Sequence, residues 1–105
     1  MRLLHKPTLI AQDFNYQQEL PDWNTSADGK SLQRQFTFVD FEKAFEFMAL
    51  CAAFAQEIDH HPDWCNSWNR VTVSLSTHSI GGLTELDIAM AHAMNQFAQQ
   101  LLSGD

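Results

Sequence analysis

The segment from Trp68 to Thr77 alternates between apolar and polar side chains, and this alternation limits the fold more than any other feature of the chain. Its apolar positions are Val71, Val73 and Leu75, and the residues between them are threonine or serine. An extended strand with this pattern has one buried face and one polar face. Strands of buried parallel sheets are instead apolar on both faces, so the alternation predicts an antiparallel sheet covered by helices on one side only.

Two longer segments predict the helices that cover this sheet. Asp40 is a candidate N-cap, and apolar residues recur after it at steps of three and four until the chain reaches Pro62. The apolar positions of this first helix are Phe41, Ala44, Phe45, Met48, Cys51, Ala52, Ala55 and Ile58. The second helix is predicted from Thr84, which forms a capping box with Asp87, to about Leu102.

The remaining elements are shorter. A helix is predicted from Thr8 to Leu20, a short strand after Trp23, a hairpin turn at Asp28-Gly29, a strand over residues 32–38, and a further short strand near Trp64. This order of elements indicates an α+β fold, with residues 1–105 forming a single domain. The helix predicted over residues 84–102 is apolar around more than half its circumference, which favours an oligomer interface.

Charge and cysteine content narrow the possible functions. The formal net charge of -7 disfavours binding to nucleic acids and to anionic membranes. No stretch approaches the roughly 18 apolar residues of a membrane span, and no apolar leader precedes the domain, so we expect a cytoplasmic protein. Cys51 and Cys65 lack the CxxC spacing, and Cys51 is predicted to be a buried free thiol.

Histidines cluster where the predicted elements end. His60 and His61 precede Pro62 at the exit of the first long helix, and His78 ends the alternating strand. If these ends pack together, the three imidazoles converge on one rim, where they could exchange protons near neutral pH. A zinc site is a second interpretation, although adjacent histidines usually diverge and there is no HExxH motif. A third is that the histidines only cap the helix C-terminus.

Several stretches of the chain form a distinctive pattern. They are Phe36-Thr37-Phe38-Val39-Asp40-Phe41-Glu42-Lys43-Ala44-Phe45, Asp59-His60-His61-Pro62-Asp63-Trp64, Trp68-Asn69-Arg70-Val71, Ser76-Thr77-His78, and Gly81-Gly82-Leu83-Thr84 with Asp87. The combination of His-His-Pro-x-Trp, Thr-His and Gly-Leu-Thr-x-x-Asp is specific. In these stretches the chain resembles the pterin-4a-carbinolamine dehydratases from about Trp23 to Phe97, in the family's order and at close to its spacing.

The resemblance implies a fold, a reaction and partners. The family fold is a four-stranded antiparallel sheet with helices on one face, and its members assemble into dimers or tetramers. The family reaction removes water from 4a-hydroxytetrahydropterin to give quinonoid dihydropterin, and it uses no metal and no organic cofactor. The implied partners are the pterin substrate, further copies of the chain, and an aromatic amino-acid hydroxylase whose pterin cofactor is recycled.

The resemblance also implies roles for individual residues. The family's catalytic histidines fall on His60, His61 and His78, and we expect His61 and His78 to form the acid–base pair while His60 assists or binds the pterin. The pterin-binding segments match Asp59-His60-His61 and Ser76-Thr77-His78-Ser79. Asp87 matches a family aspartate near the site, and this role is compatible with helix capping. His5 and His92 are given no role.

One position departs from the family pattern. Relatives usually carry a glutamate four residues before the first histidine of the pair, where this chain has Gln56. An amide can hydrogen-bond to an imidazole, but it does not stabilise the charged ring as a carboxylate does. We therefore expect activity that is lower or has its optimum at lower pH. A non-catalytic, protein-binding role as in some relatives is the alternative, and a metal-dependent hydrolase is a third possibility.

Overall fold

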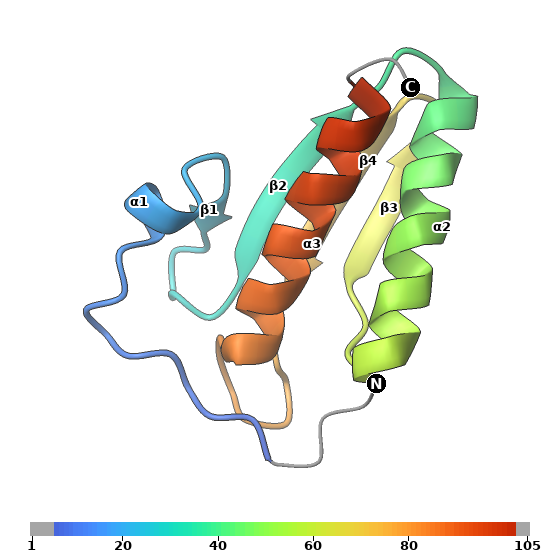
Figure 1. Ribbon diagram of the computed structural model, residues 1–105. Helices are drawn as coiled ribbons and strands as arrows, with labels where there is room; N and C mark the ends of the chain where they lie inside the picture. Colours follow the sequence, from blue (N-terminus) through green and yellow to red (C-terminus); the bar gives the residue numbers. More distant parts are fainter. Residues whose placement is uncertain (1–5, 103–105) are drawn as a thin grey trace.

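The computed structural model describes residues 6–102. Figure 1 shows the elements, which are α1 (Tyr16–Glu19), β1 (Asn24–Thr25), β2 (Leu32–Thr37), α2 (Phe41–Ile58), β3 (Asp63–Ser67), β4 (Arg70–Leu75) and α3 (Glu85–Leu102). The four strands form one sheet in the order β1-β2-β4-β3, and every neighbouring pair is antiparallel. Helices α2 and α3 lie side by side across one face (Figure 1). The predicted α+β fold with a sheet covered on one side is confirmed.

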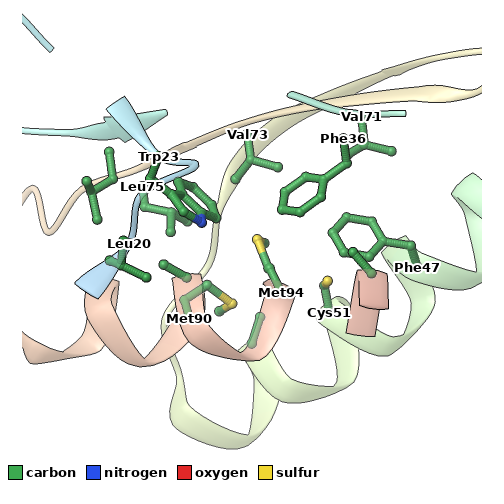
Figure 2. Packing of buried hydrophobic residues seen from close by; sticks show 14 of the residues in the cluster. Leu20, Trp23, Phe36, Phe47, Cys51, Val71, Val73, Leu75, Met90 and Met94 are labelled. Atoms are coloured by element: carbon green, nitrogen blue, oxygen red, sulfur yellow. The ribbon is translucent and has the colours of Figure 1, made fainter. Parts of the chain in front are cut away.

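The alternating strand places its apolar side chains in the core, as predicted. Val71, Val73 and Leu75 are each at most 1% exposed and face the two long helices. Figure 2 shows Val71 and Val73 on the side of Phe47 and Met94, and Leu75 beside Trp23. The threonine and serine residues between them lie on the uncovered face of the sheet, so the core occupies the single layer between the sheet and the helices.

Helix α2 begins and ends as its sequence predicts. The Asp40 carboxylate accepts a hydrogen bond from the Lys43 backbone N–H at 2.9 Å, which caps the first turn. Asp59 follows the last turn with a left-handed φ of 55°, and its backbone N–H donates to the Ala55 and Gln56 carbonyls. The chain therefore turns sharply just before His60.

The face that α2 buries agrees only in part with the predicted one. Ala44, Phe47 and Cys51 are fully buried, whereas Phe41 and Phe45 are 47% and 58% exposed. The Phe47 ring packs against aromatic rings of β2 and its extension, which turns the helix away from the predicted stripe. Burial raises the pKa of the Cys51 thiol to about 12, so this free cysteine packs as a small neutral group, as predicted.

The predicted helix from Thr8 to Leu20 is wrong over most of its length. Only Tyr16–Glu19 is helical, and the described residues before it form no helix but include a turn at residues 12–13. The Ile10 backbone N–H donates to the Leu83 carbonyl at 2.9 Å, and Leu9 forms an isolated antiparallel bridge with Thr84. This tertiary pairing overrides the local preference for a helix.

Helix α3 uses its wide apolar surface within the chain. One part faces the sheet, and another packs against α2, where Phe97 lies edge-on to Phe54 with ring centroids 6.5 Å apart. The width of the apolar face is thus explained without a second subunit, and the predicted oligomer stays a prediction. Among residues 6–102, no helix is both long enough and apolar enough to cross a membrane.

Candidate functional site

The end of α2, the end of β4 and the turn between β1 and β2 come together at one end of the sheet (Figure 1). They line an open cavity of about 370 Å³ on the face of the sheet that the helices do not cover. The cavity is lined by Ser26, Asp28, Lys30, Ser31, His61, Asp63, Ser74, Ser76, His78 and Gly81. Two of the three predicted catalytic histidines, His61 and His78, therefore line the same space.

His61 enters this cavity from the segment that links α2 to β3. Its side chain is held by the residue that departs from the family pattern, because its Nε2–H donates to the Gln56 Oε1 at 2.7 Å. Both side chains are exposed. The predicted supporting position of Gln56 is thus in direct contact with a cavity histidine, and it offers that ring a neutral acceptor.

His78 enters from the turn that follows β4. Within this turn, the Thr77 backbone N–H donates to the Gly82 carbonyl, and the Gly81 N–H donates to the Thr77 carbonyl, each at 2.9 Å. Gly81 has a φ of 84°, a conformation that side chains with a Cβ disfavour. The turn therefore holds His78 at the rim of the cavity, where its side chain is exposed.

His60 points elsewhere, into a buried hydrogen-bond network. It is 9% exposed, and its Nε2–H donates to the Asp87 Oδ1 at 2.6 Å. The other carboxylate oxygen of Asp87 accepts from the Thr77 hydroxyl at 2.7 Å and from the Thr84 backbone N–H at 2.9 Å. The Thr84 hydroxyl donates to the Thr77 hydroxyl at 2.7 Å.

In this network Asp87 caps α3 and also bonds to His60. Its bond to the Thr84 N–H, together with the bond from the Leu86 N–H to the Thr84 hydroxyl, forms the predicted cap of α3. Its bond to His60 ties α3 to the exit of α2. Because the next residue after Thr77 is His78, the carboxylate supports the neighbours of both cavity histidines.

The predicted substrate-binding residues divide into two groups. His61, Ser76 and His78 line the cavity, whereas Asp59, Thr77 and Ser79 do not, and His60 lies in the buried network. Asp59 ends α2, and Ser79 is exposed on the turn after His78. His92, which was given no role, is exposed on α3, and His5 lies outside the described residues.

One wall of the cavity was not predicted from the sequence, and the β1–β2 turn supplies it. In this turn the Ser26 hydroxyl donates to the Asp28 Oδ1 at 2.6 Å, and the Lys30 backbone N–H donates to the same oxygen at 3.0 Å. These two bonds hold the pKa of the Asp28 carboxyl below its usual value. The Ser76 hydroxyl donates to the Lys30 carbonyl at 2.8 Å and fastens the turn to the end of β4.

The cavity combines imidazoles with polar groups of both charges. Besides the two histidines it contains the carboxylates of Asp28 and Asp63, the ammonium group of Lys30 and the hydroxyls of four serines. Within residues 6–102, no group of three histidine, cysteine, aspartate or glutamate side chains is arranged to hold a metal ion. The arrangement can bind a flat polar molecule and move protons at its edge.

Comparison with known proteins agrees with this chemistry. The sequence model of the pterin 4 alpha carbinolamine dehydratase family matches residues 6–97. A protein of Nitrobacter winogradskyi is 50% identical over 82 residues, which cover 78% of this chain and 81% of that protein. A protein of Mesorhizobium japonicum is 49% identical over 79 residues, 75% of this chain and 81% of that protein. The names of both assign them provisionally to the pterin-4-alpha-carbinolamine dehydratases.

Two solved structures share the fold. A transcriptional coactivator/pterin dehydratase from Brucella melitensis superimposes with a TM-score of 0.79 and 41% identity, covering 87% of this chain and 99% of that one. A pterin dehydratase-like RuBisCO assembly factor of the alpha-carboxysome has a TM-score of 0.64 at 21% identity, covering 76% and 93%, and this likeness concerns the fold alone. The extent of the family match and the identity to its members establish that the chain belongs to the pterin-4-alpha-carbinolamine dehydratase family.

Proposed function

We propose that this protein dehydrates 4a-hydroxytetrahydropterin to quinonoid dihydropterin by histidine acid–base catalysis. The observation that carries the proposal is that His61 and His78, which come from different parts of the chain, line one open cavity. The family membership supplies the reaction class. In the cytoplasm, the reaction would regenerate the pterin cofactor of an aromatic amino-acid hydroxylase.

The proposed step needs two proton transfers. One imidazole protonates the 4a-hydroxyl, so that the C4a–O bond breaks and water leaves. The other accepts the proton of N5, and the N5–H electron pair forms the new double bond between N5 and C4a. No electrons are gained or lost, so the step balances without an oxidant or a bound cofactor.

The proposed substrate contacts follow from the two segments that carry these histidines. Within the segments Asp59-His60-His61 and Ser76-Thr77-His78-Ser79, the groups of His61, Ser76 and His78 line the cavity and would bind the polar pyrimidinone edge of the pterin. His60 assists through its bond to Asp87, which also binds Thr77. The proposed role of His60 is to position its neighbours, which is supported by its burial and by the donation of its Nε2–H to a carboxylate.

A dehydration assay with synthetic 4a-hydroxytetrahydropterin tests the proposal. We expect His61→Ala and His78→Ala each to lower the enzymatic rate by about 10²–10⁴-fold, the usual contribution of a positioned acid or base. His92→Ala is the matched control, because this histidine is exposed on α3 and does not line the cavity, and it should retain the wild-type rate. Equal rates in wild type and in all three variants would refute the proposed dehydratase activity.

We also propose that the chain forms dimers or tetramers through an exposed apolar patch. The patch consists of Val39, Phe41, Phe45, Trp68 and Leu102, which are between 47% and 75% exposed. Its segments are the start of α2, the β3–β4 turn and the end of α3, which lie together at the end of the molecule opposite the cavity (Figure 1). Several large apolar side chains exposed together are typical of an interaction surface.

Light scattering of wild type and Phe41→Glu tests this association. We expect wild type to have the mass of a dimer or tetramer and the variant to be shifted towards monomer. The same patch is what favours the alternative function, in which the chain acts only by binding another protein. That alternative requires a wild-type protein without dehydratase activity, so the assay above distinguishes the two.

A further inference from the structure

A second cavity adjoins the one that contains His61 and His78. Its volume is about 320 Å³, and it shares Lys30 and Gly81 with the first cavity. The two spaces therefore meet between the β1–β2 turn and the turn after β4. No residue of the proposed acid–base machinery lines the second cavity.

The outer wall of this second cavity is the extended segment that was expected to be helical. Leu9 and Ile10 line it, and they are held in place by the bridge to Thr84 and the hydrogen bond to the Leu83 carbonyl. On the opposite wall, a Cβ added to Gly82 would lie 3.1 Å from Leu9 Cδ2, so the two segments are in close contact. Backbone pairing and side-chain packing therefore fix this wall in the fold.

The lining of the second cavity is mostly apolar and carries one positive charge. Leu9, Ile10 and Leu83 supply aliphatic surface, and Lys30 supplies the ammonium group. Tyr16 also lines the cavity. Its pKa is raised mainly by burial and to a smaller extent by the nearby Asp87 carboxylate, so its hydroxyl stays neutral at pH 7. Lys30 is therefore the one side chain of this lining that is charged at neutral pH.

The position of this cavity relates it to a particular part of a pterin. The substituent of a pterin is attached at C6, and C6 is bonded to N5, which takes part in the proposed reaction. A substituent therefore leaves the ring beside the reacting atoms. In this protein the second cavity begins at Gly81, whose backbone N–H donates to the His78 carbonyl at 3.2 Å.

From these observations we infer that the second cavity binds the C6 substituent and selects one in which an aromatic spacer ends in a carboxylate. This inference rests on the proposed function. An aromatic spacer matches the aliphatic walls, and the carboxylate matches Lys30. A short hydroxylated chain would fill only part of the cavity and would offer the Lys30 ammonium group no carboxylate.

The backbone of Lys30 is suited to this role. Its N–H donates to Asp28, and its carbonyl accepts from the Ser76 hydroxyl, so the residue is fixed between the two cavities at both peptide groups. The side chain alone is left to follow the ligand. Substituting it should consequently change the preference among ligands without moving the turn that lines the first cavity.

Calorimetry with two stable dihydropterins tests the inference. 7,8-Dihydrofolate carries an aromatic spacer with carboxylates, and 7,8-dihydrobiopterin carries a short dihydroxypropyl chain on the same ring. We expect wild type to bind dihydrofolate about tenfold more tightly. Lys30→Met should weaken dihydrofolate binding about fivefold more than dihydrobiopterin binding, the size of one charge pair about 4 Å apart in water.

Three controls make this result specific. Lys43→Met removes the same charge from α2, where Lys43 pairs with Glu46 away from both cavities, and should leave both affinities unchanged. Ala11→Trp adds bulk at an exposed position on the second cavity and should weaken dihydrofolate binding only. Raising the salt concentration should weaken dihydrofolate binding to wild type and not to Lys30→Met.

The outcomes separate this inference from the proposed function. If Lys30→Met weakens both ligands equally, or neither, or if wild type prefers dihydrobiopterin, the inference is wrong. In that case the His78→Ala assay with a neutral-chain substrate still reports whether the protein is a dehydratase. If neither ligand binds and wild type shows no dehydration, the proposed function fails and the inference fails with it.

Discussion

Replacing Asp87 by asparagine tests the buried network that supports both cavity histidines. Asp87 is fully buried and accepts three hydrogen bonds, from His60 at 2.6 Å, from the Thr77 hydroxyl at 2.7 Å and from the Thr84 N–H at 2.9 Å. Asparagine has nearly the same shape but is neutral, and it has one acceptor oxygen. The substitution therefore removes a charge and an acceptor without leaving a cavity.

The expected cost follows from these three bonds. The asparagine oxygen can still accept from Thr77 and Thr84, but its NH₂ group then faces the Nε2–H of His60, so that ring must move its proton to Nδ1. Hydrogen bonds to a charged group contribute about 1.5–3 kcal/mol each, against about 0.5–1.5 kcal/mol for neutral ones. Losing about 1 kcal/mol at each bond lowers the free energy of unfolding by about 2–4 kcal/mol.

Urea unfolding and thermal unfolding both measure this loss. For a domain of this size, the expected decrease in Tm is about 10–25 °C. Asp22→Asn is the matched control, because it makes the same chemical change at an exposed carboxylate 3.9 Å from Arg34, and it should cost less than about 1 kcal/mol. If Asp87→Asn costs no more than this control, the carboxylate is not the charged acceptor that the hydrogen bonds require, and the reasoning fails.

Four other substitutions give further checks. Gln56→Glu should move the pH–rate profile to higher pH by about half to one unit. The reason is that a carboxylate about 4 Å from an imidazolium stabilises its charge by about 1 kcal/mol in water. An unchanged profile would show that this position has no catalytic role. Phe47→Ala should lower the free energy of unfolding by about 3–5 kcal/mol and Phe45→Ala by less than 1 kcal/mol, measured in urea; the reverse order would show that the predicted stripe faces the core. Asn95→Ala should cost about 1–3 kcal/mol by the same measurement, since it leaves the indole N–H of the buried Trp23 without its acceptor at 2.8 Å, and a neutral effect would place a water there.

The parts of the fold that could be predicted are those whose causes are local. The alternation around Val73 identifies a strand with one buried face, and Asp40 marks where α2 begins, because side-chain period and capping act within a few residues. The segment around Ile10 could not be predicted, because its backbone partner is Leu83, at the other end of the chain. The buried face of α2 also depends on distant residues, since the Phe36 ring of β2 packs against Phe47.

The same distinction applies to the candidate site. The histidines attract notice in the sequence because their chemistry is unusual and because they stand at the ends of elements. Lys30 has no such signal, since it looks like an ordinary turn residue. It reaches the cavity because β2 pairs with β4, so that Leu32 at the start of β2 lies opposite Leu75 at the end of β4. That pairing brings the turn before β2 to the turn after β4.

The adjacent histidines acquire different roles because of the turn that precedes them. Asp59, with its φ of 55°, ends α2, and the two side chains that follow leave the backbone towards different surroundings. His60 bonds to Asp87 inside the protein, while His61 bonds to Gln56 and lines the cavity. One stretch of backbone carries both, so a change that lets His60 turn also shifts His61. The cost of Asp87→Asn in stability and its effect on the reaction should therefore have a common cause, although Asp87 does not line the cavity.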